Sequence, residues 1–483
     1  MFRCERRNAP YAGRIHGIRM KDIRRYILTP SYTFRGWKLL PWAVQAYDHP
    51  QTEFLRREQW DLFSACDGQT DIDWDALTEE QKKWYSHWEK NGFIRRAEHG
   101  ERLFPHQEYR FYPARFKESV QWSITGRCNY QCRHCFMSAP HAAQGEPDWE
   151  RLMIMLDAFE RCGIHNLSLT GGEPMYRRDF WLLVDEILRR GMIVPTLYSN
   201  GLLITNAFLD ELSKRHMRPS IQFSFDGVGY HDWMRGVHGA EKVVLDALKR
   251  CQERGIPTSV SMVLFRENLG SIRETANLLA SLGCSGLKTG RVIASGEWKQ
   301  YTDHSITQAQ LYEAYLDYIP RYFEDGAPLS LVLDGFFVHE NDTGRELSPI
   351  EKGIPEQDFH KALMCGHVRR DLYVSPKGNV LPCMSMVGGP MEEQFSNMLE
   401  TPLEEILDDG SFYMDAINFR VSDFMEHNPE CKTCEYRTLC CGGCRAQAVL
   451  ARPGDYLAKD PVTCEYYRGG WMERKNELLA RIS

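Results

Sequence analysis

Three cysteines stand close together in the run TGRCNYQCRHCFMS. Cys128, Cys132 and Cys135 have the spacing C-x3-C-x2-C. Three thiolates can bind three irons of a [4Fe–4S] cluster and leave the fourth iron without a protein ligand. An open metal position is typical of a catalytic site, whereas a structural site is usually closed. The alternative is a zinc site completed by His134 or His141, because zinc also binds thiolate and imidazole ligands.

A second group of cysteines lies in the C-terminal quarter of the chain. Its seven members are Cys365, Cys383, Cys431, Cys434, Cys440, Cys444 and Cys464. A zinc ribbon needs only four cysteines, so this number indicates more than one metal site. Cys441 lies outside the spacing, and we expect it to bind no metal. Three more cysteines fall near the ends of expected helices and are interpreted as buried small apolar residues, namely Cys162, Cys251 and Cys284.

The composition is that of a globular chain. With 483 residues, 43% hydrophobic and 26% charged, it excludes a disordered chain and suggests two to four domains. No run approaches the roughly 20 apolar residues of a membrane span, and the net charge of −7 argues against nucleic acid or membrane binding. Residues 1–20 are basic without the apolar segment of a secretory signal, and Met20 is an alternative start. We therefore expect a cytoplasmic location, where clustered cysteines bind metal.

Residues 111–320 contain the elements that must position the first cysteines. Short apolar runs predict strands at 119–125, 166–171, 195–201, 220–227, 259–265 and 286–293. Amphipathic helical stretches separate them, which indicates a parallel sheet with right-handed crossovers. Six such units are too few for a closed eight-stranded barrel, so we expect an open, partial (β/α)6 barrel. Its chemistry should lie at the carboxyl ends of the strands, and the first cysteines follow the first strand.

The flanking regions look different. Residues 1–110 predict short strands at 24–30 and 33–42, helices at 52–68 and 77–92, and a small β-wing at 93–98 and 101–104. This order is winged-helix-like. Residues 321–360 are polar and contain Gly and Pro, which predicts a linker. Residues 361–483 have weak periodicity, so we expect metal rather than an apolar core to organise them.

The first cysteine group resembles the signature of radical S-adenosylmethionine (SAM) enzymes. The resemblance implies that SAM chelates the open iron, and that an electron from the cluster splits SAM to a 5′-deoxyadenosyl radical that abstracts a substrate hydrogen. SLTGGEP, YSNG and SFDG…HDWMRG match further family motifs at strand ends. Glu173 can accept hydrogen bonds from the SAM amino group, and the fork of Arg235 suits the SAM carboxylate. The residues expected to contact SAM are His134, Gly171, Gly172, Glu173, Ser199, Asn200, Ser224 and Arg235, with Asp226 in the same motif.

The second cysteine group resembles the SPASM domain, a C-terminal extension of radical SAM enzymes with two auxiliary [4Fe–4S] clusters. The resemblance implies one cluster held by Cys431, Cys434, Cys440 and Cys464, and another held by Cys365, Cys383 and Cys444. Fully cysteine-ligated members have an eighth cysteine upstream, but residues 285–364 contain none. The second of these clusters therefore has an open iron, or a ligand such as Asp358 or His360.

SPASM enzymes mostly modify peptides or proteins. The sulfatase-maturing branch has an Asp directly after the second SPASM cysteine, and Met384 at that position disfavours sulfatase maturation. The other large branch crosslinks ribosomally made precursor peptides and often has an N-terminal winged-helix domain. We therefore expect a thioether crosslink of the sactipeptide or ranthipeptide type in a peptide whose leader binds residues 1–110, with ferredoxin or flavodoxin as reductant.

Several alternatives stay open. Carbon–carbon cyclisation, epimerisation or decarboxylation of a peptide would use the same sites. A DNA-binding winged helix would need a basic surface, but acidic and basic residues are about equal in number in the N-terminal region. A ferredoxin-like electron carrier would need neither the GGEP motif nor a barrel. No catalytic acid or base is identified from the sequence.

Overall fold

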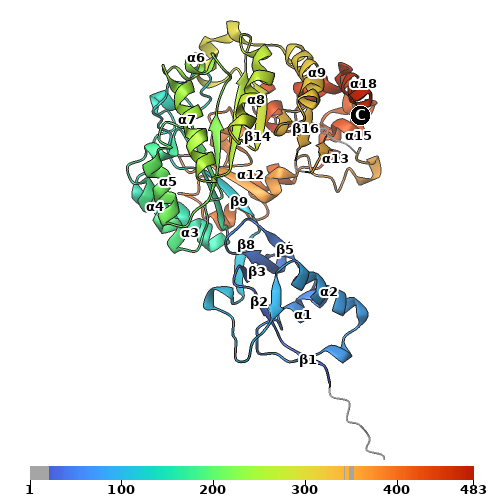
Figure 1. Cartoon of the computed structure of the whole chain (residues 1–483). Coiled ribbons are helices and arrows are strands. Elements are labelled where there is room, and N and C mark those ends of the chain that lie inside the picture. Colours follow the sequence, from blue (N-terminus) through green and yellow to red (C-terminus); the bar gives the residue numbers. More distant parts are fainter. Residues whose placement is uncertain (1–20, 342, 348–352, 483) are drawn as a thin grey trace, which may run out of the picture. The chain divides into compact units, whose positions relative to one another are not determined.

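The computed structural model describes residues 21–341, 343–347 and 353–482. The expectations for residues 1–20, Met20 among them, lie outside these ranges. The chain forms two compact units (Figure 1). The first contains the chain up to Gly36 together with Trp42–Ala46 and Thr52–Arg110, and the second contains the remainder. None of the helices in the described ranges combines the length and the apolar character that a membrane span requires.

The first unit combines three small sheets with two helices. Its strands are β1 (Ile23–Arg24), β2 (Tyr26–Leu28), β5 (Thr52–Phe54), β6 (Ile72–Asp73), β7 (Ile94–Arg96) and most of β3 (Tyr32–Lys38) and β4 (Leu40–Ala46), and its helices are α1 (Arg57–Phe63) and α2 (Glu79–Lys90). Strand β8 (Arg110–Arg115) begins at the last residue of this unit. Strands β5, β4, β3 and β8 form one sheet in that order, β2 pairs with β7, and β1 pairs with β6. An aromatic core that includes Phe34, Phe63, Tyr85 and Trp88 holds this unit together.

The two strands and the helix over 77–92 expected in the first unit are present, but the helix expected over 52–68 covers only Arg57–Phe63, because Thr52–Phe54 form strand β5, and the wing is absent. Thr78 caps α2 by accepting a hydrogen bond from the Gln81 amide. Strand β7 pairs with β2, and residues 101–104 form no strand. The Arg95 side chain instead pairs with Glu101, which holds the chain between them in a turn. The winged-helix assignment therefore stays a prediction.

The second unit is built on one continuous sheet. Its central strands are β9 (Ser119–Ser123), β10 (Asn166–Thr170), β11 (Thr196–Ser199), β12 (Ser220–Ser224), β13 (Thr258–Leu264) and β14 (Gly286–Arg291). All six are parallel and follow one another in chain order, as the sequence predicts. Leu167, Leu169, Leu197 and Phe223 are fully buried, because a parallel sheet is covered on both faces.

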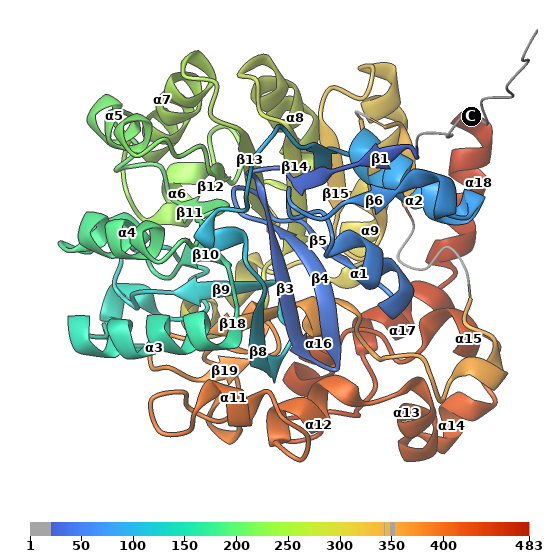
Figure 2. The ribbon, with the colours of Figure 1, turned by 90° about the horizontal axis from the view of Figure 1, so that it is seen from below.

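Helices cover the outside of this sheet. They are α3 (Trp149–Cys162), α4 (Phe180–Arg189), α5 (Asn206–Lys214), α6 (His231–Arg235), α7 (Ala240–Glu253), α8 (Ile272–Ser281) and α9 (Gln308–Glu324). Figure 2 shows α3, α4, α5, α7 and α8 following one another around the curved sheet. The predicted partial barrel is therefore confirmed.

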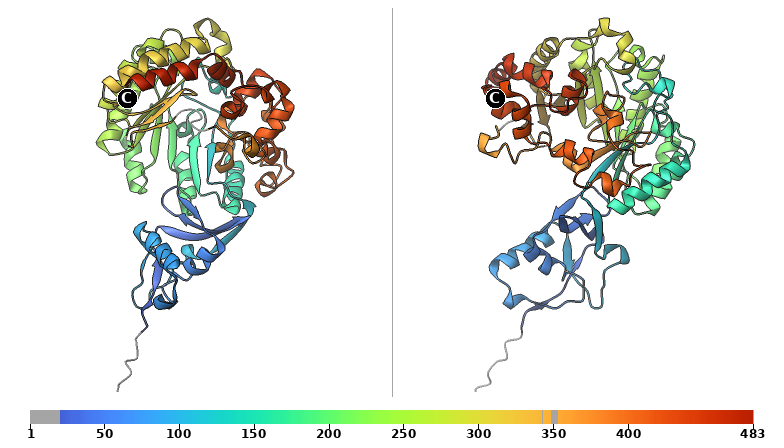
Figure 3. Two further views of the ribbon diagram at one scale, coloured as in Figure 1. Left: turned by 90° about the vertical axis from the view of Figure 1, so that its right-hand side faces the viewer. Right: turned by 180° about the vertical axis from the view of Figure 1, so that it is seen from behind.

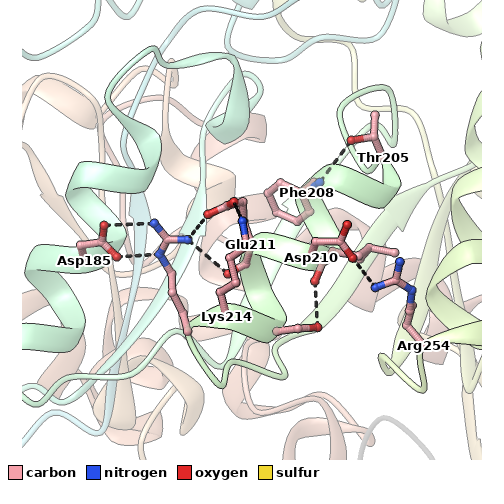
Figure 4. A network of polar contacts seen from close by, with 10 residues as sticks. Asp185, Thr205, Phe208, Asp210, Glu211, Lys214 and Arg254 are labelled. Carbon is pink, nitrogen blue, oxygen red and sulfur yellow. Dashed lines mark hydrogen bonds and ion pairs between the residues drawn. The ribbon is translucent and has the colours of Figure 1, made fainter.

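Exposed ion pairs join neighbouring outer helices (Figure 4). Arg215 pairs with Asp185 on α4 and with Glu211 on α5. Arg254, just after α7, pairs with Asp210 on α5 at 2.6 Å. Exposed pairs of this kind contribute only about 0–1 kcal/mol each, so the buried apolar face of each helix supplies most of the packing energy.

The segment predicted as a linker instead extends the sheet. Strands β15 (Ser330–Leu333), β16 (Phe337–Glu340) and β17 (Arg345–Leu347) lie within residues 321–360. Strand β15 is parallel to β14, and β16 and β17 continue antiparallel. Leu331, Leu333 and Phe337 are buried, which offsets the polar turns that suggested a linker.

The C-terminal region adds two strands and many short helices. These elements are α10 (His367–Arg370), β18 (Asp371–Val374), β19 (Val380–Leu381), α11 (Leu403–Ile406), α12 (Phe412–Asn418), α13 (Val421–His427), α14 (Pro429–Lys432), α15 (Arg437–Cys440), α16 (Arg445–Ala451), α17 (Pro461–Arg468) and α18 (Trp471–Ile482). Strand β18 pairs in parallel with β9, so this region shares the barrel sheet. Helix α18 lies along α9 (Figure 3), and Arg474 pairs there with Glu313.

Candidate metal centres

The first three cysteines lie in the loop between β9 and α3, and all three are partly buried. Each sulfur accepts a hydrogen bond from nitrogen. The donors are the Tyr130 amide (3.4 Å) and Asn200 Nδ2 (3.8 Å) to Cys128, Arg235 Nη1 (3.8 Å) to Cys132, and the Ala139 amide (3.2 Å) to Cys135. Donors aimed at sulfur stabilise thiolates that carry negative charge. The surroundings therefore fit the ligands of an iron–sulfur cluster.

The same thiols are poor acids without a metal. Burial, together with the charge of Cys132, raises the pKa of Cys128 to about 12. Burial also raises the pKa of Cys135 to about 11, although the Ala139 amide opposes it. A bound metal removes this penalty, because a coordinating thiol is deprotonated outright.

The two histidines of the single-zinc alternative lie in different surroundings. His141 is largely exposed and lies 3.5 Å from Glu297. His134 Nδ1 is buried without a hydrogen-bond partner, and burial lowers the pKa of this histidine to about 3. Within the described ranges, no group of three or more His, Cys, Asp or Glu side chains lies close enough to hold one ion.

The Gly171–Glu173 turn follows β10 and presses against the cysteine loop. The amide of Gly172 donates to the Thr125 carbonyl at 2.8 Å, and that of Glu173 donates to the Arg127 carbonyl at 2.9 Å. A Cβ on Gly172 would lie only 2.0 Å from the Arg127 carbonyl oxygen. This glycine is therefore required by close contact with the cysteine loop itself, in addition to any role near a ligand.

Glu173 is fully buried at the centre of this site. Its carboxylate accepts hydrogen bonds from the Ser199 hydroxyl (3.2 Å) and the Asn200 amide (2.9 Å), at the end of β11. Burial raises the pKa of Glu173 to about 7, against the lowering effect of these donors. A buried carboxylate with donors on one side is suited to receive N–H groups of a ligand on the other.

Asn129 completes this arrangement and was missed by the sequence analysis. Its Oδ1 accepts a hydrogen bond of 2.7 Å from Asn200 Nδ2, which ties the cysteine loop to the end of β11. The sequence feature that could have identified Asn129 is its position directly after Cys128, inside the first cysteine group. Ser224 ends β12 half-buried and takes part in no side-chain hydrogen bond among the described residues.

Arg235 lies at the end of α6, and protein partners already engage two of its nitrogens. Nε lies 2.7 Å from Asp226 Oδ2, and Nη1 donates to Cys132. The SAM carboxylate that was expected to bind the Arg235 guanidinium would therefore compete with Asp226 and Cys132 for it.

The C-terminal cysteines separate into two places. Cys431, Cys434, Cys440 and Cys464 line one cavity together with Tyr467, Lys459 and Arg468. The four residues that the SPASM resemblance groups together therefore surround one space. Between Cys440 and Cys444, the backbone adopts positive φ at Cys441, Gly442 and Gly443, with values of 45°, 91° and 72°. This turn directs Cys444 away from the cavity, toward the remaining cysteines.

Cys365, Cys383 and Cys444 are neighbours, since the charges of Cys444 and Cys365 add to burial in raising the pKa of Cys383 to about 12. The buried phenol of Tyr456 faces the same group: burial and then the charges of Cys383 and Cys365 raise its pKa. No sequence signal marked this tyrosine. Asp358, one of the two expected extra ligands, pairs with Lys361 at 3.2 Å.

Comparisons with known proteins agree with these two regions. Residues 122–279 match the radical SAM superfamily, and residues 365–435 match the SPASM iron–sulfur cluster-binding domain. An AdoMet-dependent heme synthase of Nitratidesulfovibrio vulgaris is 26% identical over 354 residues, covering 72% of this chain and 92% of its own length. A PqqA peptide cyclase of Granulibacter bethesdensis is 26% identical over 350 residues, covering 70% and 85%.

The fold also matches solved structures. Streptococcus suis SuiB bound to its precursor peptide SuiA has a TM-score of 0.61 at 15% identity, covering 91% of this chain and all of that one. The cofactors of the two matched domains are SAM with a [4Fe–4S] cluster and auxiliary iron–sulfur clusters. The cysteine surroundings described above fit these groups. The chain therefore contains a radical SAM domain followed by a C-terminal SPASM domain.

Proposed function

We propose that this enzyme modifies a ribosomally made precursor peptide and forms a thioether crosslink in it. The observation that carries the proposal is the extent of the match to SuiB in its peptide complex. A match over 91% of the chain must include part of the N-terminal unit, because residues 1–110 are more than the unmatched share. The similarity therefore extends beyond the two iron–sulfur domains.

The N-terminal unit offers a place for a leader peptide. Strand β5 is an outer strand of its four-stranded sheet. An extended peptide can add to such an edge through main-chain hydrogen bonds. The leader would thereby bind apart from the segment that reacts.

In the barrel, the chain's own residues would hold SAM. Glu173, oriented by Ser199 and the Asn200 amide, accepts hydrogen bonds from the amino group of SAM. Gly171 and Gly172 bring this turn against the cysteine loop, which also carries His134, and Ser224 ends β12. Bound to the cluster of Cys128, Cys132 and Cys135, SAM supplies a 5′-deoxyadenosyl radical that removes a hydrogen atom from the substrate.

The proposed crosslink balances as an oxidation. One S–H bond and one C–H bond of the peptide are replaced by one C–S bond. A hydrogen atom leaves to the SAM-derived radical, a proton leaves from the thiol, and one electron must be accepted. The C-terminal clusters are the acceptor we propose, and a low-potential ferredoxin or flavodoxin in the cytoplasm is the external electron donor.

A second candidate is oxidation of a tetrapyrrole, because the similarity to heme synthases covers 72% of this chain. That reaction gives no role to a peptide-binding N-terminal unit. The two candidates therefore differ in whether residues of the first unit contribute to substrate affinity.

The test uses the anaerobic, reduced holoenzyme, SAM, and any short cysteine-containing precursor peptide encoded beside the gene. We expect the peptide to lose two hydrogens per crosslink, with the new C–S bond located by tandem mass spectrometry. Removing the leader from the peptide should raise KM more than it lowers kcat. An unchanged peptide, together with turnover of an iron tetrapyrrole precursor, would instead support the second candidate.

A further inference from the structure

A chain of fully buried polar groups ends on one cysteine of the first group. Asp226, between β12 and α6, is 0% exposed, and Arg235 is 6% exposed. Their ion pair, 2.7 Å between Nε and Oδ2, is buried. Burying two charges is costly unless the geometry is well supported. The pair therefore needs neighbouring groups that fix its geometry.

Three elements hold Asp226. Its Oδ1 accepts a hydrogen bond from the Val263 amide on β13 at 3.1 Å. Its backbone carbonyl accepts one from Asn268 Nδ2 at 2.9 Å. The Nδ1 atom of His231 on α6 accepts a hydrogen bond from the Asp226 amide at 3.1 Å, and it lies 3.4 Å from Asp226 Oδ2. Asn268 and His231 are themselves fully buried, so the carboxylate has little freedom to move.

Arg235 connects the Asp226 carboxylate to the cysteine loop. Its Nη1 donates to Cys132 Sγ at 3.8 Å. By contrast, Cys128 and Cys135 receive hydrogen bonds only from uncharged amides in the described part of the chain. Among the three sulfurs, Cys132 is thus the one that receives a hydrogen bond from a positively charged side chain in the described part of the chain.

A charged donor on a thiolate ligand changes the redox equilibrium of a cluster. Reduction adds negative charge to the cluster and its sulfurs, and hydrogen bonds to the sulfurs stabilise that charge. The interaction is strong where water is excluded and weaker where water screens it. Arg235 is buried, so water does not screen its interaction with Cys132.

We propose that Arg235 is a positioning residue for the cluster, held on Cys132 by Asp226, and that it raises the reduction potential of this cluster alone. The proposal rests on the proposed assignment of the SAM-binding cluster to Cys128, Cys132 and Cys135. It differs from a role in binding the SAM carboxylate. In that role, the guanidinium would change SAM affinity without needing contact with sulfur.

The experiment compares Arg235→Gln and Arg235→Lys with the wild type as full-length reconstituted holoenzymes. The matched control is Arg177→Lys. Arg177 is buried, forms an ion pair with the partly exposed Asp179 and donates to the Ile124 and Pro147 carbonyls, and none of these contacts is to sulfur. Two quantities are measured: the midpoint potential of the cluster whose electron paramagnetic resonance signal responds to SAM, and the Kd of SAM.

We expect Arg235→Gln to lower the ratio of reduced to oxidised cluster at a fixed potential about tenfold. For a one-electron couple, this corresponds to a midpoint potential that is lower by about 59 mV. Arg235→Lys keeps the charge but cannot reach Asp226 and the sulfur with one rigid fork, so it should shift the potential less. Arg177→Lys should leave the potential unchanged. The Kd of SAM should change less than threefold in all variants.

An unshifted potential in Arg235→Gln overturns the inference. So does a normal potential with strongly weakened SAM binding, which would assign Arg235 to the SAM carboxylate. If both Arg235 variants lose only this cluster and Arg177→Lys keeps it, the positioning role is supported, whereas loss in all three variants overturns it. A wild-type protein without any SAM-responsive cluster would instead defeat the proposed function itself.

Discussion

The two groups of cysteines are held by different means. In the barrel, the loop that carries Cys128, Cys132 and Cys135 rests on the ends of parallel strands and on the backbone of the Gly171–Glu173 turn. In the C-terminal region, Cys431, Cys434 and Cys440 lie on or between helices of only four residues. Helices this short are unstable alone. The first site is therefore preorganised by the protein, whereas the second needs its metal to fix the local structure.

The contrast is local, because the C-terminal region also has an apolar core. Leu372 and Val374 on β18 are buried against the barrel, and β18 pairs with β9. The expectation that metal rather than a core organises residues 361–483 thus holds at most around α14 and α15. Five predictions can break or sharpen this comparison.

Removal of iron should produce the largest difference between the two regions. In the chelated, anaerobic protein, we expect backbone amides of residues 428–444 to exchange about 1,000-fold faster. This corresponds to a loss of about 4 kcal/mol in the free energy of local opening. Amides of β9–β14 should keep their protection, since the sheet does not depend on metal. Hydrogen exchange with mass spectrometry checks both, and equal loss in the two regions would remove the distinction.

Alanine substitutions beside the two cysteine groups should also differ. A Cβ on Gly172 would lie 2.0 Å from the Arg127 carbonyl oxygen, whereas nothing lies within 4 Å of one on Gly366, next to Cys365. Gly172→Ala should therefore displace the cysteine loop and lower the occupancy of the barrel cluster, by about one third of total iron if three four-iron clusters are present. Gly366→Ala is the control and should keep full iron. Equal iron in both variants would contradict a preorganised loop.

Glu173→Gln should weaken SAM binding about 100-fold, or about 2.7 kcal/mol, because a charged hydrogen-bond acceptor is lost from a buried site. Isothermal titration of the holoenzyme measures this change, and Glu393→Gln serves as an exposed control. Unaltered affinity would remove Glu173 from the SAM site.

The same variant has a pH signature in SAM-free protein. The folded pKa of Glu173 is raised by burial to about 7, from an ordinary value of 4.5. The stability of the wild type relative to Glu173→Gln should therefore fall as pH rises from about 4.5 to 7 and stay level above. Thermal unfolding of both proteins across this range tests the sign, and an opposite slope would contradict the burial of this carboxyl.

The smallest effect concerns the contact between the two regions. Lys117 is buried before β9 and donates to the Val368 carbonyl at 2.6 Å, three residues after Cys365. Burial, with repulsion from Arg369, lowers its pKa to about 7. The wild type should lose stability as pH falls from about 10.5 to 7, and Lys117→Met should gain about 1–2 kcal/mol at neutral pH relative to it. Denaturation at pH 7 and pH 10 checks this, and a gain that is larger at pH 10 would be contrary to the prediction.

Much of the barrel could be predicted because its pattern is local. Each strand from β9 to β14 is a short apolar run between turn residues, and each following helix has apolar residues on one face. Cap residues are similarly local, as the Thr78 hydroxyl on the Gln81 amide illustrates. The cysteine spacings and the GGEP motif supplied the site through resemblance.

Contacts between distant residues could not be predicted in this way. The pairing of β18 with β9 joins residues about 250 positions apart, and nothing in either strand specifies its partner. Strand β15 was hidden because its four residues are flanked by Gly, Pro and Asp. The contacts of Arg235 with Asp226 and Cys132 depend on the meeting of α6 with the cysteine loop, which the sequence motif alone does not reveal.

The most direct test of the central claim is SAM cleavage by anaerobically reconstituted protein, with the triple variant Cys128→Ala/Cys132→Ala/Cys135→Ala beside it. We predict that the reduced wild type contains inorganic sulfide and releases 5′-deoxyadenosine, and that the triple variant releases none while keeping the iron of its C-terminal region. Zinc in place of sulfide at these three cysteines, or undiminished 5′-deoxyadenosine from the triple variant, would contradict the account.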